Sequence, residues 1–507
     1  MLALIKSFGL KGLEGFPVQA EIDMHAGMPT YDIVGLADTA VKESKERVRS
    51  ALKNSGYQYP VASVVVNLAP ADIKKEGSLY DLPIALGLLA ASKQIPYNSF
   101  KKAVVLGELS LNGEVRKVNG LLPMIITAVQ QGETTFVIPK QNADEVVFIE
   151  GAQIYAVENL VEAVEFLTSQ SELEPLTIRS WKKDLSVNHS DNDFKYIKGQ
   201  FAAKRAMEIA VAGGHNIIMI GPPGAGKTML ARAVPSIMPN LTFEEALEVA
   251  KIHSVSGQLD GFIYERPFRT PHHSSTMVAL TGGGNRARPG EISLAHNGVL
   301  FLDELPEYSR QTLETLRQPL EDGVITVARN AMSVTYPADF MLVASMNPCP
   351  CGNYGSATAE CKCSASQIHR YLNKLSGPLL DRIDIHIEVD NVTYDQLQVD
   401  AFAEPSSAIR ERVNRSREIQ RARLTPHGRR CNAQMTPADI KKYCKLDPQS
   451  VSLLEESFEK LKLTARAYNR VLKVARTIAD LDNSENITVR HVAESLQYRM
   501  LDRKYRV

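Results

Sequence analysis

The sequence NIIMIGPPGAGKTMLAR, residues 216–232, decides the fold of the larger part of this 507-residue chain. Its four apolar residues 217–220 predict a buried strand, and the residues after position 228 have helical character. Between them lies the pattern G-x-x-x-x-G-K-T, from Gly221 to Thr228. Glycines let backbone N–H groups close around phosphates, and the N-terminus of a helix favours negative charge. The stretch therefore predicts a phosphate-binding loop between a strand and a helix.

Individual residues of this loop have expected roles. Lys227 is expected to reach the β- and γ-phosphates of ATP, and Thr228 to place its hydroxyl on Mg²⁺. We therefore expect ATP and Mg²⁺ as cofactors. The loop residues expected to surround them are Gly221, Pro222, Pro223, Gly224, Ala225, Gly226, Lys227 and Thr228.

A second apolar strand, residues 299–302, ends in the carboxylates Asp303 and Glu304. Asp303 suits the Mg²⁺ shell, and Glu304 suits polarising the attacking water. Alone, the pattern is also typical of a buried strand that ends in solvated acids. The phosphate-binding loop upstream favours the catalytic interpretation.

Asn347 ends a third apolar strand, residues 340–345, where its amide is placed to orient water or contact the γ-phosphate. An ordinary asparagine at a strand end is the alternative. Arg382, in the stretch GPLLDRID, is a candidate for stabilising charge on a neighbouring subunit's γ-phosphate, and a surface ion pair with Asp381 or Asp384 is its alternative.

The composition excludes some classes of protein. Lysine plus arginine equals aspartate plus glutamate, at 58 each, so no strong field recruits DNA or an anionic membrane to the whole molecule. The longest apolar run, residues 84–91, is too short to cross a bilayer, and no signal peptide is recognisable at the start. We expect a cytoplasmic protein without a membrane partner, whose six cysteines are thiols or metal ligands.

Pattern and composition divide the chain into segments. Residues 1–170 mix short strands with helices and predict an α+β domain, and residues 171–193 have the composition of a linker. Residues 194–390 alternate strands and helices, which predicts an α/β core with a parallel sheet and helices on both faces. This core contains a predicted insertion at 253–288 and a cysteine loop at 349–363. Residues 391–507 predict a helical lid.

These motifs, in this order, resemble the magnesium chelatase-like branch of AAA+ ATPases, and within it the ComM (YifB) family. The resemblance covers nearly the entire chain and is most specific at FRTPHHSS (268–275), RPGEISLAHNG (288–298), NPCPCG (347–352) and SGPLLDRID (376–384). It implies Asn347 as sensor 1, Arg382 as an arginine finger acting across a subunit interface, and Arg466 as sensor 2, with Arg470 as the second choice. It also implies a homo-hexameric ring.

The amino-terminal domain is similar to the carboxy-terminal domain of Lon proteases (a ribosomal S5 domain 2-like fold), at KEGS (75–78) and GELSLNGEVRKVNGLLP (107–123). A peptidase of this type needs a serine activated by a lysine. Leu122 occupies the position that would carry the lysine, and the residues around Ser78 also depart from the protease pattern. We therefore expect a noncatalytic scaffold or nucleic-acid contact, with Ser78 in a turn or helix cap.

The cysteine loop contains two close pairs of cysteines. Four thiolates suit a structural tetrahedral Zn²⁺ site, but C-x-C spacing is tighter than the usual C-x-x-C, and four reduced thiols are the alternative. The candidate ligands are Cys349, Cys351, Cys361 and Cys363. His272 and His273 are adjacent in an extended segment and so are poor partners for one ion, which favours pore-loop or interface contacts.

Two segments are candidates for DNA contact. The predicted insertion 253–288 contains basic, aromatic and glycine residues, and the alternative is a plain surface insertion. The arginines between positions 410 and 430 form the densest basic run, and the alternative is a solvated lid helix with Glu411 and Glu418 as ion-pair partners.

The sequence and the resemblance together predict an ATP-driven hexameric motor that moves along single-stranded or branched DNA. The resemblance implies a helicase that promotes branch migration when single strands are integrated during natural transformation or homologous recombination. The alternative is a chelatase-type motor that remodels a protein partner, and an ATP-dependent protease is disfavoured by Leu122. A nucleotide switch would require slow hydrolysis despite Glu304. Partners that load the ring are not predicted.

Overall fold

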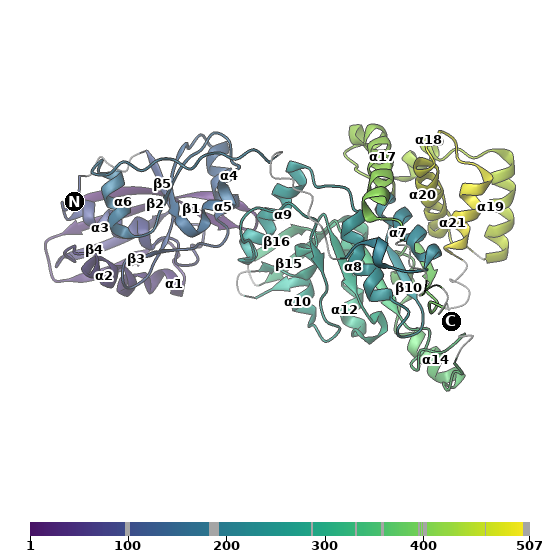
Figure 1. The fold of residues 1–507 in the computed structure, drawn as a ribbon. Helices are drawn as coiled ribbons and strands as arrows, with labels where there is room; N and C mark the ends of the chain where they lie inside the picture. Colours follow the sequence, from purple (N-terminus) through teal and green to yellow (C-terminus); the bar gives the residue numbers. More distant parts are fainter. Residues whose placement is uncertain are drawn as a thin grey trace. The chain divides into compact units, whose positions relative to one another are not determined.

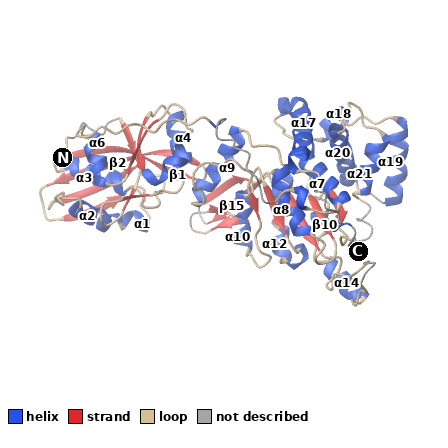
Figure 2. Cartoon of the chain, in the orientation of Figure 1, coloured by secondary structure: helices blue, strands red, loops and turns tan. Residues whose placement is uncertain are grey.

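The computed structural model describes residues 1–96, 102–181, 192–284, 287–329, 332–355, 359–393, 396, 398, 403–461 and 463–499. The chain forms two compact units (Figure 1). The first comprises residues 1–186 and 246–264, and the second comprises residues 187–245 and 265–507. Each unit combines strands and helices (Figure 2), as expected for the mixed α/β class.

The first unit is built on a mixed sheet with the strand order β3-β4-β2-β1-β5-β8-β9. The pair β1–β2 is antiparallel, and β5, β8 and β9 run parallel to one another. The strands are β1 (Leu2–Lys11), β2 (Glu14–His25), β3 (Thr30–Val34), β4 (Ser63–Ala69), β5 (Ala103–Val105), β8 (Thr135–Pro139) and β9 (Gln153–Val157), with a small hairpin of β6 (Glu108–Leu109) and β7 (Val115–Arg116). The helices are α1 (Thr39–Lys42), α2 (Ser44–Asn54), α3 (Asp81–Ala91), α4 (Leu121–Gln130), α5 (Ala143–Val146) and α6 (Leu160–Leu167).

The longest apolar run of the sequence forms helix α3, in which every residue is buried. Among the described residues, no helix has the length and apolar character needed to span a lipid bilayer. Leu122 is fully buried in α4, and the hydroxyl of Ser78 donates to the carboxylate of Glu108. The Ser78 hydroxyl therefore pairs with a carboxylate. That this unit is noncatalytic and related to Lon proteases stays a prediction.

Residues 246–264 complete the core of the first unit. They include most of α9 (Phe243–Ser256) and contribute the buried side chains of Ala250 and Leu259 to the apolar cluster of the first unit. Lys117 Nζ donates to the carbonyl of Leu259 at 2.6 Å. Part of the predicted linker also packs here, since the N–H of Leu176 donates to the carbonyl of Ile154 at 2.8 Å. The predicted insertion 253–288 is thus divided between the two units.

The second unit contains a sheet with the order β11-β14-β17-β10-β18, in which every neighbouring pair is parallel. Its strands are β10 (Ile217–Ile220), β11 (Phe268–Arg269), β14 (Val299–Leu302), β17 (Met341–Met346) and β18 (Ile385–Glu388). Two further pairs are β12 (Gly282–Gly283) with β13 (Arg288–Pro289) and β15 (Val324–Arg329) with β16 (Met332–Pro337). The three apolar strands predicted from the sequence are confirmed, and β10, β17 and β14 are consecutive in the sheet.

The helices of the second unit include α7 and α8 next to the sheet strands in sequence, and a helical carboxy-terminal region. They are α7 (Phe201–Gly213), α8 (Lys227–Ile237), α10 (Met277–Thr281), α11 (Glu291–Leu294), α12 (Arg310–Glu314), α13 (Arg317–Asp322), α14 (Ala365–Leu372), α15 (Gly377–Leu380), α17 (Ser406–Leu424), α18 (Pro437–Tyr443), α19 (Pro448–Leu461), α20 (Ala465–Leu481) and α21 (Val489–Gln497). Short 3-10 helices are η5 (Leu305–Glu307) and η7 (Asn432–Gln434).

Many arginines of the basic run on and after α17 have partners inside the second unit. Arg412 pairs with Glu208 and Glu404, Arg423 with Asp480, and Arg429 with Asp439. Arg417 donates to the carbonyl of Val211, and Arg421 and Arg430 lie within 3.8 Å of Glu245. None of the ion pairs found in the described residues joins this run to Glu411 or Glu418. These arginines hold elements of the second unit together, so the alternative of a solvated lid helix paired with Glu411 and Glu418 does not describe them.

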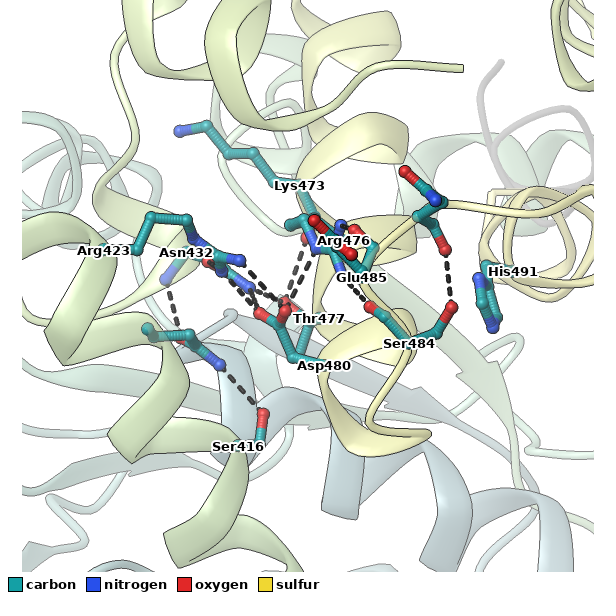
Figure 3. Close-up of polar contacts among 12 residues, drawn as sticks. Ser416, Arg423, Asn432, Lys473, Arg476, Thr477, Asp480, Ser484, Glu485 and His491 are labelled. Carbon is teal, nitrogen blue, oxygen red and sulfur yellow. Dashed lines mark hydrogen bonds and ion pairs between the residues drawn. The ribbon is translucent and has the colours of Figure 1, made fainter. Parts of the chain in front are cut away.

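Asp480 is the centre of a buried polar network in the carboxy-terminal helices (Figure 3). Its carboxylate accepts hydrogen bonds from Arg423 at 2.6 and 3.1 Å, from Arg476 Nε at 3.0 Å and from Asn432 at 2.8 Å. Asn432 also donates to Thr477, whose hydroxyl lies 2.8 Å from His215 Nε2 at the start of the sheet. The network therefore joins α17, η7 and α20 to the segment that precedes β10.

Replacing Asp480 with asparagine is expected to destabilise the carboxy-terminal helices by about 3 to 5 kcal/mol, because the buried guanidinium of Arg476 and the partly buried one of Arg423 lose their anionic partner. Hydrogen–deuterium exchange of the α20 amides measures this locally. Glu456→Gln is the matched control, since Glu456 pairs with Lys460 on the exposed surface of α19. Equal α20 protection in both variants would contradict the structural role of Asp480.

Candidate functional site

The phosphate-binding loop connects β10 to α8, which begins at Lys227. Gly224 and Gly226 adopt positive φ angles of 81° and 85°, a conformation that glycine reaches without strain. Lys227 Nζ donates to the carbonyls of Gly221 at 2.7 Å and Pro222 at 2.8 Å, and to Asn347 Oδ1 at 3.1 Å. The predicted sensor 1 residue therefore contacts the predicted phosphate-binding lysine directly.

Thr228 and Asp303 meet at the position expected for a magnesium ion. Thr228 Oγ1 donates to Asp303 Oδ2 at 3.0 Å, and the Ser345 hydroxyl donates to Asp303 Oδ1. Hydroxyl and carboxylate oxygens are the ligands that Mg²⁺ prefers. The donor set therefore fits Mg²⁺, with Thr228 and Asp303 as the protein ligands. Mg²⁺ would neutralise charge on the phosphates of ATP.

Glu304 lies immediately beyond Asp303 with a φ of 52°, in the left-handed region that costs a non-glycine residue about 1 to 3 kcal/mol. Its backbone N–H donates to Asp303 Oδ1 at 3.1 Å. Its side chain is 55% exposed and lies 3.7 Å from His273 Nδ1. This conformation leaves the carboxylate accessible to a water molecule, as a general base requires.

His273 reaches Glu304 from the segment that follows β11. Tyr308 holds this segment, since its hydroxyl donates to the carbonyl of Pro271 at 2.6 Å. His272 turns to Ser274, with 2.7 Å between Nδ1 and the hydroxyl oxygen. The sequence predicts pore-loop or interface contacts for both histidines and does not predict the contact of His273 with Glu304. The TPHH sequence alone gave no signal for it, because β11 and β14 become neighbours only in the folded sheet.

Burial lowers the pKa of Lys227, and the carboxylates of Asp303 and Glu304 oppose this shift. Lys227 is 8% exposed. It lies with Asn347, Asp303 and Glu304 at the carboxyl ends of the three consecutive strands β14, β17 and β10. A cationic amine, a hydroxyl, two carboxylates and an amide can bind a nucleoside triphosphate with Mg²⁺ and activate water. The structure thus brings together the core of the site predicted from sequence.

In the described part of the chain, the hydrogen bonds of the Arg382 side chain go to Pro378 and Glu321 and not to the residues named above. Its side chain is 8% exposed, forms an ion pair with Glu321 and donates to the carbonyl of Pro378 at 2.8 Å. The alternative predicted from the sequence is an ion pair between Arg382 and Asp381 or Asp384. The observed partner is Glu321 on α13. The role across a subunit interface stays a prediction.

Arg466 and Arg470, the two sensor 2 candidates, have different surroundings on α20. Arg466 is 61% exposed and lies 3.8 Å from Glu321. Arg470 is 18% exposed and lies 3.2 Å from Asp384 Oδ1. Burial raises the pKa of Asp384, but Arg470 and His215 more than offset this and hold it below its usual range. Arg470 therefore has a structural partner, while Arg466 is accessible.

The four cysteines of the loop after β17 come together. Their sulfur atoms all lie within 4.8 Å of one another, and Cys349 Sγ is 3.4 Å from Cys351 Sγ and 3.7 Å from Cys361 Sγ. Backbone N–H groups of Asn353 and Lys362 lower the pKa of Cys351, whereas burial and the neighbouring cysteines raise the pKa values of Cys361 and Cys363. Four thiolates of this spacing fit a soft divalent cation such as Zn²⁺.

The chain is similar over nearly its whole length to bacterial proteins named ComM and YifB. The competence protein ComM of Haemophilus influenzae is 44% identical over 99% of this chain and 98% of its own length. The uncharacterized protein YifB of Escherichia coli is 42% identical over the same shares of the two chains. The chain belongs to the ComM/YifB family of magnesium chelatase-like proteins. The family and the geometry of the site indicate an ATPase.

Family models match three consecutive regions of the chain. Residues 193–397 match magnesium chelatase, subunit ChlI; residues 20–142 match subunit ChlI of Mg-chelatase; and residues 403–499 match the magnesium chelatase, subunit ChlI C-terminal region. The match over residues 193–397 contains every residue of the ATP and Mg²⁺ site described above. Membership of the family accounts for use of both ATP and Mg²⁺.

Arg466 and Arg470 are expected to differ when each is replaced by alanine. Arg470→Ala leaves Asp384 buried without its guanidinium partner and should lower stability by about 3 kcal/mol, measured as a lower thermal midpoint. Arg466→Ala should leave the midpoint unchanged, because its side chain is exposed, and reduce ATP hydrolysis, because the predicted sensor 2 guanidinium is lost. Wild-type hydrolysis in Arg466→Ala, with loss of hydrolysis at unchanged stability in Arg470→Ala, would reverse the assignment.

Proposed function

We propose that this protein is an ATP-hydrolysing AAA+ motor that acts on DNA as a helicase and promotes branch migration when single strands are integrated during natural transformation or homologous recombination. The ATPase part is carried by one observation, the meeting of Lys227, Thr228, Asp303 and Asn347 at the ends of adjacent strands. The DNA part is supported by full-length similarity to a protein named for competence. Such a motor would work in the cytoplasm.

The active form in this proposal is a homo-hexameric ring. Arg382 would act as an arginine finger on the nucleotide of the adjacent subunit, where a guanidinium group stabilises charge on the transferred phosphoryl group. Its partner Glu321 is 52% exposed whereas Arg382 is 8% exposed, so the guanidinium would have to leave this pair to reach the adjacent subunit. Arg466 lies near the same carboxylate and would serve as sensor 2.

A basic hollow of about 750 Å³ on the second unit supports contact with a phosphate backbone. It is lined by Arg310, Ala365, Ser366, His369, Arg370, Asn373 and Lys374, from the start of α12 and from α14. Lys374 lies 3.3 Å from Glu307, whereas Arg310 and Arg370 form no ion pair within the described residues. Two unpaired arginines beside a lysine provide the local positive charge that the neutral composition lacks.

Zn²⁺ is proposed as a second, structural metal at Cys349, Cys351, Cys361 and Cys363. Among the described residues the cluster consists of these four cysteines, and four thiolates would fill a tetrahedral shell without the open position of a catalytic zinc. The metal would order a loop that otherwise has little regular structure. Its removal by a chelator would not be expected to affect the Mg²⁺ ligands Thr228 and Asp303 directly.

A chelatase-type motor that remodels a protein partner is the second candidate. The matches to magnesium chelatase family models along the chain favour it. The two candidates share the ATPase site and differ in what stimulates it, namely DNA or a dedicated partner protein. An ATP-dependent protease is disfavoured because Leu122 stands where the protease lysine is needed.

ATP hydrolysis by the purified protein is expected to increase with single-stranded or branched DNA, because a motor hydrolyses ATP as it moves along its track. Steady-state phosphate release with and without each DNA measures this. Glu304→Gln is the control and should lower hydrolysis about 100-fold or more while retaining ATP binding. Clear basal hydrolysis that no DNA changes would contradict the DNA motor and favour the protein-remodelling candidate.

Replacing both Arg310 and Arg370 with alanine should weaken single-stranded DNA binding and reduce the magnitude of its salt dependence. Each lost phosphate contact removes about 0.7 from the slope of log K against log salt, so the pair should remove about 1.4. Fluorescence anisotropy over a salt series measures both quantities. Arg410→Ala with Arg415→Ala is the matched double variant, because these α17 arginines also form no ion pair in the part of the chain that the structure describes. Weaker DNA binding in the α17 variant alone would indicate that α17, and not the hollow, contacts the DNA.

A further inference from the structure

The cysteine turn, defined here as residues 349–355, packs on the phosphate-binding loop. The two meet at Gly352, where a β-carbon would lie 2.5 Å from Cδ and 3.2 Å from Cγ of Pro223. A separation of 2.5 Å is well inside van der Waals contact, so the turn and the proline ring meet without room for a side chain. Pro223 is one of the loop residues expected to surround the phosphates. The backbone of the cysteine turn therefore forms one wall of the ATP-binding loop.

A second connection runs through the chain itself. Asn347 precedes Cys349 by two residues, and its side chain accepts a hydrogen bond from Lys227 Nζ at 3.1 Å. Cys349 is fully buried, and its sulfur accepts from the N–H of Tyr354 at 3.3 Å, while its carbonyl accepts from the N–H of Gly352 at 3.0 Å. Cys349 thus lies between Asn347, which contacts Lys227, and Gly352, which packs on Pro223.

The sulfur positions already approach the geometry of a metal site. A tetrahedral Zn²⁺ with bonds of about 2.3 Å requires sulfur atoms about 3.8 Å apart. The measured separations of 3.4, 3.6 and 3.7 Å among Cys349, Cys351 and Cys361 are close to this value. The described residues 347–355 contain no helix or strand after β17, so few backbone hydrogen bonds hold the turn. Four metal–sulfur bonds would supply the missing constraint.

We propose that a thiophilic divalent cation bound by Cys349, Cys351, Cys361 and Cys363 and ATP bound at Gly221–Thr228 are thermodynamically coupled, each raising the affinity of the protein for the other. The inference rests on the proposed ATP and zinc sites and goes beyond them. With the cation bound, the turn holds Pro223 and Asn347 in the positions that the phosphates require. Without it, the turn and both contacts become mobile, and ATP binding must first order them.

The coupling is tested by measuring two affinities on the full-length protein. The first is the dissociation constant of a fluorescent ATP analogue, with Mg²⁺, for protein loaded with Zn²⁺ and for protein stripped by a chelator and kept reduced. We expect stripped protein to bind the analogue about 5-fold or more weakly. The second is Zn²⁺ affinity by competition with a colorimetric chelator, with and without ATP. Linkage requires the same factor in both directions.

The direct contact is tested with a pair of glycine variants. Gly352→Ala and Gly428→Ala both place alanine at a positive φ, 81° and 70°, so they share similar backbone strain. A β-carbon at Gly352 meets Pro223, whereas none of the described atoms lies within 4 Å of a β-carbon at Gly428. All four cysteines remain in both variants. Gly352→Ala should weaken binding of the ATP analogue, and Gly428→Ala should not.

The outcomes separate this inference from the proposed function. Equal analogue affinity in zinc-loaded and stripped protein overturns the coupling but leaves ATPase activity and zinc binding in place. Failure of the four-cysteine protein to bind Zn²⁺ also overturns it, again without affecting the ATPase. Failure of zinc-loaded wild-type protein to bind the analogue contradicts the proposed ATPase function and, with it, the coupling. Equal factors in the two titrations, together with the selective effect of Gly352→Ala, support the coupling.

Discussion

The parallel pairing of β17 with β10 on one side and β14 on the other is the constraint on which the functional site depends. Carboxyl ends of parallel strands meet at one edge of a sheet, and ligands of open α/β sheets bind there. The loop after β10 provides Lys227, the end of β14 provides Asp303 and the end of β17 provides Asn347. The strand order alone therefore brings residues more than a hundred positions apart into hydrogen-bond contact.

Much of this site could be predicted because its signals are local in the sequence. A run of apolar residues followed by a loop motif, two carboxylates or an amide identifies both the strand and the chemistry at its end. Ser345 could not be predicted, because a serine inside an apolar strand is ordinarily an element of the core. Its contact with Asp303 depends on the register between β14 and β17. The His273 contact and the packing of Gly352 on Pro223 depend in the same way on tertiary structure.

The partners of the charged residues outside the site could not be predicted from the sequence. The arginine run on α17 has the composition of a nucleic-acid surface, yet many of its members bind carboxylates that lie far away in the sequence. Arg412 reaches Glu208 and Arg423 reaches Asp480, pairs that no local spacing indicates. Buried carboxylates are costly unless they are paired, and arginine provides several donors for each partner. The accessible positive charge of this protein is therefore better located from its structure than from residue counts.

The first unit is discontinuous in the chain, because residues 246–264 complete its core after the phosphate-binding strand and helix have already been passed. A ribosome therefore synthesises Ala250 and Leu259, which belong to the first core, later than β10 and α8 of the second. Domains generally fold in the order of synthesis. Here the amino-terminal unit completes its core only when residue 264 has been synthesised, after β10 and α8 of the second unit but before the other four strands of the second sheet.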